Sequence, residues 1–167
     1  IEYLYRDILG HHQQSLESVD AVAILFDVHK NTEQRLGRSH YDSFDNFFPV
    51  ALKLLGELEE VMMANQTARR VKEVLQNIEF AKFHSLSEYF KNFYEGVEHR
   101  CFVTRSMIYR TVANEIEKID LSSNEKIILA GFYAFTNVEK KIIEVLEKKR
   151  NVKFIFQDGT GWIERLK

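Results

Sequence analysis

Hydrophobic positions near the end of the chain predict a strand, a helix and a second strand. Residues 127–132 form a short continuous apolar run, IILAGF, and residues 152–156 form a second run, VKFIF. Such runs are typical of buried strands in a parallel sheet. Between them, Thr136 and Glu139 form an S/T-x-x-E capping box, and apolar residues then recur at helical spacing. We therefore expect a right-handed βαβ unit in which residues 138–148 connect two parallel strands.

The first 120 residues have the apolar spacing of helices. Gly37 marks the end of the first predicted helix, and Pro49 suits the first turn of the second, where its missing N–H has no cost. The apolar spacing of the second helix predicts a buried stripe of Ala51, Leu52, Leu55, Leu58, Val61 and Met62. The first expected helix covers residues 16–36, and the third begins at Asn65 or Thr67. A fourth begins at a Ser85–Glu88 capping box, and after residue 102 a helix resumes and continues to Ile119.

The fold class that these patterns predict is mostly α, with a small parallel α/β element. One proline and seven glycines in 167 residues favour long helices over an all-β fold. We expect a helical subdomain over residues 1–120 and the βαβ element over residues 121–167, packed as one unit. Two strands make too small a sheet to be covered on both faces. Apolar side chains around Ile127, Leu129, Phe154 and Phe156 are therefore expected to remain partly uncovered. We expect either self-association through this region or its burial under the N-terminal helices.

The turn after the first predicted strand lacks the acidic residues of an ATPase. Ligands of open α/β sheets bind at the carboxyl ends of the strands. Superfamily I helicases place an Asp-Glu pair there, which holds Mg²⁺ and orients the attacking water, and a further Asp follows three residues later. This chain has Ala130, Gly131 and Ala134 at the corresponding positions. None of these side chains binds a metal or moves a proton, so we assign no catalytic residue, metal or cofactor to the chain.

The same turn, G-F-Y-A-F-T over residues 131–136, resembles the G-F-T-x-F-T turn of the AddB/RexB subunits of bacterial recombination nucleases. The longer pattern ILAGFYAFTNVE is similar to the inactivated helicase-like (UvrD-like) region of large Bacteroidetes proteins that carry a PD-(D/E)XK nuclease domain. Residues 41–61 resemble that family's F-D-x-F-x-P-W-x-x-x-L-L-x-D-F-x-x-V segment. Residues 108–113, IYRTVA, resemble its G-x-x-Y-R-x-V-A stretch.

This resemblance implies part of a RecA-like P-loop NTPase half together with its inserted, 1B-like helical subdomain. It implies a non-catalytic scaffold in a DNA repair or recombination nuclease, whose partners are the rest of the parent chain and a helicase or nuclease subunit. No G-x-x-x-x-G-K-[ST] phosphate loop occurs in the chain. Asp158 stands where the family has acidic residues after its second strand and is a vestigial acidic position. A turn-forming role before Gly159 is the alternative for Asp158.

Charge and composition limit what the chain contacts. A net charge of −2 leaves no overall electrostatic footprint for DNA, so only auxiliary contact is expected, through Arg100, Arg105 and Arg110. A solvated helix face is the alternative for these arginines. Cys101 is the single cysteine, which excludes an internal disulfide and fits the reducing cytoplasm. No apolar run reaches the length of a membrane span, and the first residue, Ile1, suggests an excised piece of a larger protein.

A second function class stays open on the sequence. The chain could be a free-standing helical protein-interaction module that is unrelated to helicases. The two hypotheses differ in the pairing of the two predicted strands. A parallel βαβ unit favours the helicase-like domain, and an antiparallel hairpin favours the interaction module.

Overall fold

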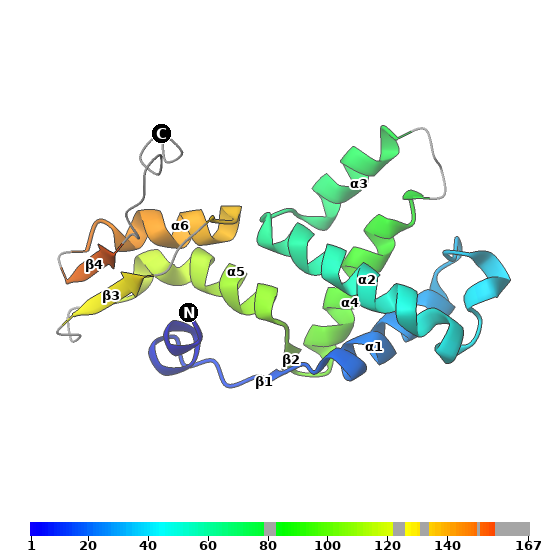
Figure 1. The fold of residues 1–167 in the computed structure, drawn as a ribbon, viewed down its shortest axis with the longest axis horizontal. Helices are drawn as coiled ribbons and strands as arrows, with labels where there is room; N and C mark the ends of the chain where they lie inside the picture. Colours follow the sequence, from blue (N-terminus) through cyan, green and yellow to red (C-terminus); the bar gives the residue numbers. More distant parts are fainter. Residues whose placement is uncertain (79–82, 122–125, 131–133, 150, 156–167) are drawn as a thin grey trace.

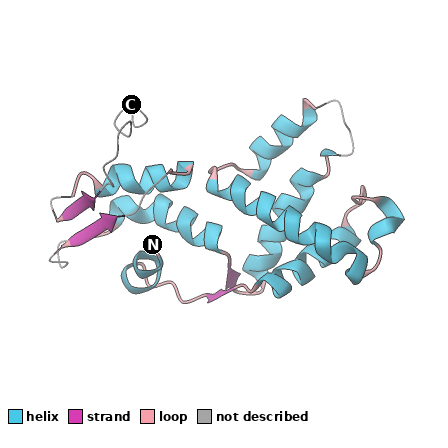
Figure 2. Ribbon diagram, in the orientation of Figure 1, coloured by secondary structure: helices cyan, strands magenta, loops and turns pink. Residues whose placement is uncertain are grey.

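The computed structural model describes residues 1–78, 83–121, 126–130, 134–149 and 151–155. Helix dominates this part of the chain, and strand is confined to two short parallel pairs (Figure 2). In chain order, the elements are η1 (Leu4–Ile8), β1 (Gln14–Ser15), α1 (Ser18–Asn31), η2 (Arg38–Tyr41), α2 (Phe44–Met63), α3 (Ala68–Gln76), α4 (Leu86–His99), β2 (Phe102–Val103), α5 (Arg105–Glu115), η4 (Ile116–Lys118), β3 (Ile127–Ala130), α6 (Asn137–Leu146) and β4 (Val152–Ile155).

The elements form two groups along the long axis of the molecule (Figure 1). In the first group, α1, α2 and α4 enclose a hydrophobic cluster, and α3 packs against α4. In the second group, η1, α5, α6 and the β3–β4 pair surround a separate cluster. Helix α5 also contacts α2, so it joins the two groups. The buried side chains of the first cluster include Leu25, Phe47, Tyr89 and Phe93, and those of the second include Ile116, Leu121, Ile142 and Leu146.

The predicted βαβ unit is confirmed. Strands β3 and β4 pair in parallel, with Ile127 opposite Val152 and Ala130 opposite Ile155, and α6 lies between them in the chain. The expected parallel pairing therefore holds, although the predicted strand ends at Phe132 and Phe156 lie outside the described residues. The predominance of helix is also as expected.

Only one face of this sheet is packed. Ile127, Leu129 and Phe154 are half-buried against the second cluster, as expected for a sheet with too few strands. The opposite face carries Ile128 and Ile155, which are 54% and 55% exposed. The full burial that the two apolar runs indicated is therefore wrong for the described residues, because side chains alternate between the two faces of the sheet and helices cover only one of them.

Two predicted helix limits are wrong. Helix α1 ends at Asn31, and Thr32 is already extended, so the predicted helix up to residue 36 is too long. Gly37 has a φ of 64° and precedes η2 instead of ending α1. The α2 helix begins earlier than predicted, after Ser43, whose hydroxyl accepts the Asn46 N–H. As a result, Pro49 lies inside the helix and not in its first turn.

The buried stripe of α2 differs from the prediction at single positions. Ala51, Leu58 and Met62 are buried as predicted, whereas Leu52 is 42% exposed. The full stripe is Phe47, Ala51, Leu54, Leu58 and Met62. Helices α1 and α5 pack against α2, and the directions from which they approach determine which of its positions are covered.

Of the two predicted capping boxes, one forms. At α6, Thr136 accepts the Glu139 N–H and Glu139 accepts the Thr136 N–H, as predicted. At α4, the Ser85 side chain makes no capping bond, and that box is wrong. Ser85 has helical backbone angles, which turn its hydroxyl away from the free N–H groups of the first turn. Thr67 caps α3, which selects one of the two predicted starts for that helix.

Two further features of the fold were not predicted from the sequence. Strands β1 and β2 form a two-residue parallel pair that attaches the N-terminal segment to the turn before α5. Helix α2 ends in a Schellman motif: Asn65 has a φ of 59°, its N–H bonds to the Met62 carbonyl, and the Gln66 N–H bonds to the Val61 carbonyl. This motif directs the chain from α2 into α3.

Candidate functional site

The predicted Walker B-like positions lie at and after the end of β3. Ala130 is the last residue of β3 and is exposed, and Ala134 is exposed in the segment that leads into α6. Neither brings a carboxylate to the end of the strand. Gly131 and Asp158 lie outside the described residues.

The segment that follows β3 borders a hollow of about 580 Å³ between the two groups of helices. The end of α2 contributes Glu59, Glu60, Met63 and Ala64. The start of α5 and the start of α6 provide the remaining walls, with the side chains of Arg105, Ser106, Thr136, Asn137 and Glu139. The hollow therefore lies where the N-termini of two helices face the C-terminal end of a third.

A hydrogen-bonded network centred on Glu59 forms one wall of this hollow. One Glu59 oxygen accepts the Ser106 N–H at 3.1 Å, and the other accepts the Ser106 hydroxyl at 2.7 Å. The Tyr94 hydroxyl lies 3.0 Å from the second oxygen, and the Thr104 hydroxyl lies 3.1 Å from that of Ser106. Burial, and then the Glu59 charge, raise the pKa of the Tyr94 phenol far above its ordinary value. Tyr94 therefore stays protonated and available as a donor to Glu59.

Carboxylates of the protein itself occupy both helix N-termini in the hollow. Glu59, from α2, binds the first turn of α5, and Glu139 closes the capping box of α6. A helix N-terminus favours negative charge, and a free one is a ready phosphate site. Here the positions are filled. Glu60 adds a third carboxylate, and Arg105 is the one cation among the described residues that line the hollow. The electrostatics of the hollow therefore oppose a nucleotide phosphate.

The same carboxylates do not form a metal site. Within the described ranges, no group of three or more histidine, cysteine, aspartate or glutamate side chains has the arrangement needed to hold a metal ion. The Glu59 carboxylate already accepts bonds from Tyr94 and Ser106. The network accordingly positions α5 against α2 and α4.

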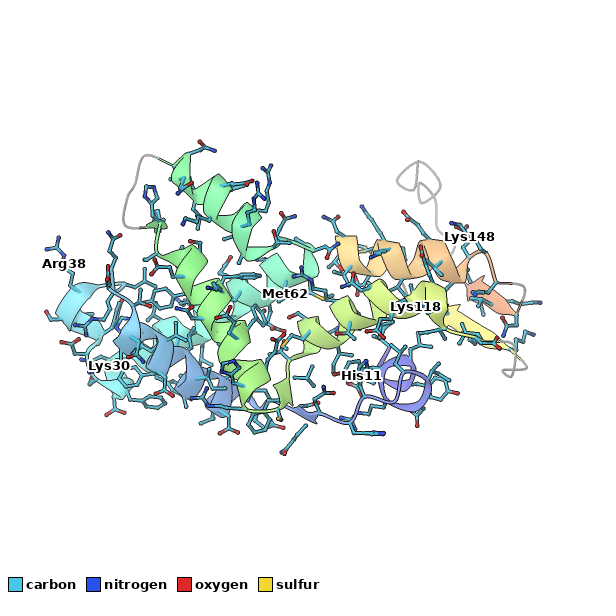
Figure 3. All side chains as sticks on the ribbon, turned by 180° about the vertical axis from the view of Figure 1, so that it is seen from behind. His11, Lys30, Arg38, Met62, Lys118 and Lys148 are labelled. Atoms are coloured by element: carbon cyan, nitrogen blue, oxygen red, sulfur yellow. The ribbon has the colours of Figure 1, made fainter. Side chains whose placement is uncertain are left out.

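The three predicted DNA-contacting arginines are not brought together on one face. Arg100 pairs with Asp27 at 3.0 Å and donates to the Gly96 carbonyl. Arg110 is half-buried and donates to the Gln66 carbonyl at 2.8 Å. It also contacts the sulfur of Met62, which lies near the centre of Figure 3, where the two groups of helices meet.

Arg105 has a different environment from the other two arginines. It is exposed at the mouth of the hollow, with its guanidinium 5.3 Å from the centre of the Tyr109 ring. The Tyr109 hydroxyl, at 3.4 Å, is the first cause of a raised Arg105 pKa. Arg100 is exposed as well, but it pairs with Asp27, whereas Arg105 forms no ion pair among the described residues.

No sequence pattern indicates that Glu59, Tyr94 and Ser106 form a group. Glu59 follows Leu58 of the buried stripe, and Tyr94 lies in the buried aromatic pattern of α4. One local signal was present: Thr104 caps α5, which places Ser106 in a first turn with free N–H groups. The carboxylate that binds this turn comes from 47 residues earlier, so the local pattern does not identify it.

Comparisons with known proteins found no relative of this chain, because no protein-family model, curated protein or solved structure matches it. Among the described helices, none is long and apolar enough to cross a membrane.

Proposed function

We propose that this chain is a non-catalytic, helicase-like domain that serves as a scaffold in a DNA repair or recombination nuclease. The observation that carries the proposal is the parallel β3–α6–β4 unit, whose first strand ends at Ala130 without a carboxylate. Parallel pairing is the property that separates this hypothesis from a free-standing helical interaction module, for which an antiparallel hairpin is expected.

The chemistry around the end of β3 supports a non-catalytic role. Hydrolysis of ATP needs carboxylates that hold Mg²⁺ and orient water. Ala130 and Ala134 supply neither function. The Glu59 and Glu139 carboxylates of the neighbouring hollow bind the first turns of α5 and α6, so they are already engaged.

The uncovered face of the sheet supports a role as part of a larger assembly. Ile128 and Ile155 are more than half exposed, and no further strand pairs with β3 or β4 among the described residues. In a RecA-like half, additional strands would pair at these edges, and helices would cover the face that carries Ile128 and Ile155. The partners proposed here are therefore the rest of a parent chain and a helicase or nuclease subunit, in the cytoplasm.

DNA contact in this proposal is auxiliary and centres on Arg105. Arg100 pairs with Asp27, and Arg110 donates to the Gln66 carbonyl, so both are engaged within the domain. Arg105 is exposed beside the hollow, and a phosphate could reach its guanidinium from solvent. One such contact gives weak, salt-sensitive binding that does not depend on DNA sequence.

The proposal is tested at two levels. The first is the reading frame that encodes this chain, in which a PD-(D/E)XK nuclease signature is expected. A reading frame without any nuclease signature, whose product leaves linear duplex DNA intact, would contradict the proposed role.

The second test measures fluorescence anisotropy of a labelled forked DNA with this chain at low and high salt. Weak binding that disappears at high salt is expected, and Arg105→Glu should reduce it. The matched control is Arg38→Glu, because Arg38 is an exposed arginine at the far end of the molecule (Figure 3). Equal losses for both variants would contradict a specific role of Arg105, and the scaffold role would stand without DNA contact.

A further inference from the structure

A buried histidine and a buried tyrosine connect residues 32–42 to the helical core. His29, near the end of α1, and Tyr89, on α4, are both fully buried. The His29 Nδ1 atom lies 2.6 Å from the Tyr89 hydroxyl oxygen. The same oxygen accepts the backbone N–H of Leu36 at 3.3 Å, so three parts of the chain meet at one hydroxyl.

This arrangement selects one neutral form of the imidazole. The Tyr89 oxygen accepts from Leu36, and its single proton is free to be donated to His29 Nδ1. Nδ1 must then carry a lone pair, which places the ring proton on Nε2. Nε2 is buried without a well-formed hydrogen bond among the described residues, and the backbone of Tyr41 is the polar group beside the ring.

A second proton on His29 is incompatible with these contacts. A protonated Nδ1 becomes a donor, so the Tyr89 hydroxyl loses its acceptor inside a buried site. The positive charge would also be buried beside aromatic rings, with the Phe47 ring stacked at 4.4 Å and the Phe26 ring at 6.3 Å. A buried charge without a partner is strongly disfavoured.

We propose that His29 and Tyr89 form an acid-sensitive latch that holds residues 32–42 against the helical core and releases them when His29 takes up a second proton. This inference is independent of the proposed scaffold function. It assigns to the buried pair a conformational role that neither the βαβ unit nor the Glu59 network requires.

The charged groups around the ring agree with this direction. Burial is the first cause of a lowered His29 pKa, and the positive charges of Arg35 and Lys30 lower it further. The Asp42 carboxylate raises the His29 pKa, but it forms an ion pair with Arg35 at 2.7 Å, so its charge mainly offsets that of Arg35. On the α4 side, Glu88 is the carboxylate that acts on Tyr89. The surroundings as a whole keep His29 neutral in the closed form.

Apart from Leu36 and Tyr41, which pack against the first hydrophobic cluster, the segment that the latch holds has few other attachments to the helices among the described residues. The Arg35–Asp42 pair is largely exposed and lies within the segment, so it does not tie the segment to a helix. The Asn46 side chain donates to the His40 carbonyl at 3.3 Å, also in an exposed position. Residues of this segment and Phe83 line a hollow of about 880 Å³, which would change shape if the segment moved.

The test is amide hydrogen exchange at Leu36, corrected for the intrinsic pH dependence of exchange. If His29 has its ordinary pKa only in the open form, the opening equilibrium should rise about tenfold between pH 7.5 and 5.5. The Leu58 amide, in the core helix α2, should not follow this curve. Imidazole ¹⁵N shifts at pH 7.5 should place the proton of His29 on Nε2.

Variants separate the latch from general acid sensitivity. His29→Gln should remove the pH dependence at Leu36, whereas His99→Gln, at an exposed histidine of α4, should retain it. Tyr89→Phe should raise Leu36 exchange already at pH 7.5, because the amide loses its acceptor. If His29→Gln fails to fold, the Tyr89→Phe and ¹⁵N results decide. The latch would be overturned if the opening equilibrium at Leu36 did not change with pH, or if the Leu58 amide showed the same change. A ring proton of His29 on Nδ1 at pH 7.5 would overturn it as well.

Discussion

The Glu59 carboxylate accepts two hydrogen bonds from Ser106, one from its N–H at 3.1 Å and one from its hydroxyl at 2.7 Å. This contact binds the end of α2 to the first turn of α5. Helix α5 is also the element that packs against α6 of the βαβ unit. Three polar contacts therefore connect the sheet and its helices to the first helical group: the Glu59 carboxylate, the Arg110 side chain that donates to the Gln66 carbonyl, and the Asn137 side chain that donates to the Ala64 carbonyl.

Removal of the Tyr94 hydroxyl should weaken this joint. In Tyr94→Phe, the Glu59 carboxylate at 3.0 Å and the buried Leu58 carbonyl at 3.1 Å lose the one hydroxyl proton that they share. We expect a loss of about 1–2 kcal/mol in the free energy of unfolding, measured with urea. The control is Tyr109→Phe, at a half-buried hydroxyl, which should cost less than half as much. Equal losses would contradict the special role of the network.

Asn65 occupies a left-handed backbone position that glycine adopts without strain. Asn65→Gly should keep the Schellman motif and raise stability by a few tenths to about 1 kcal/mol, because asparagine tolerates this region less well than glycine. Asn65→Val should lower it by about 1–2 kcal/mol. Thermal unfolding of both variants provides the measurement. Asn77→Gly, at the end of α3 with a φ of −84°, is the matched control and should bring no gain.

The lowered His29 pKa predicts that stability falls in mild acid. In the unfolded chain, histidine binds a proton near pH 6.5, whereas folded His29 binds it only at lower pH. The unfolded state therefore holds more protons below pH 6.5. The stabilising contribution is complete above that pH and is lost as pH falls through it. Urea unfolding between pH 7 and 5.5 should show a slope of up to about 1.4 kcal/mol per pH unit. A slope that persists in His29→Gln would contradict this origin.

The uncovered face of the sheet predicts self-association of this chain. Ile128 and Ile155 lie on the open face of the sheet, whereas Phe154 lies on the packed face. Ile155→Lys should reduce concentration-dependent light scattering and leave the melting temperature nearly unchanged. Phe154→Lys should instead destabilise the fold. Val19→Lys, at an exposed valine of α1, is the control. Scattering that Ile155→Lys leaves unchanged would contradict association through this face.

No hydrolysis of Mg-ATP is expected from this chain. Ala130 and Ala134 provide no ligand for the metal, and the carboxylates of the nearby hollow repel phosphate. A coupled phosphate-release assay on highly purified protein gives the measurement. Turnover above background that Asp158→Ala abolishes would contradict the prediction and would assign an active role to that residue.

Local chemistry was sufficient to predict the elements that depend on neighbours in the chain. The IILAGF and VKFIF runs predicted β3 and β4, and their separation by one helix predicted the parallel pairing. Thr136 and Glu139 are three residues apart, so their capping box is readable from sequence. The same pattern failed at Ser85, because a capping bond also needs extended backbone angles at the cap, and residue order does not specify them.

The contacts between distant residues were decided by tertiary structure alone. Glu59 and Ser106 are 47 residues apart, and His29 and Tyr89 are 60 residues apart. Periodic spacing identified the buried face of each helix, but it carries no information on which helix covers that face or at what angle. That angle exposes Leu52, directs Glu59 to the first turn of α5 and closes the latch at Tyr89, since a hydrogen bond needs both partners within about 3 Å.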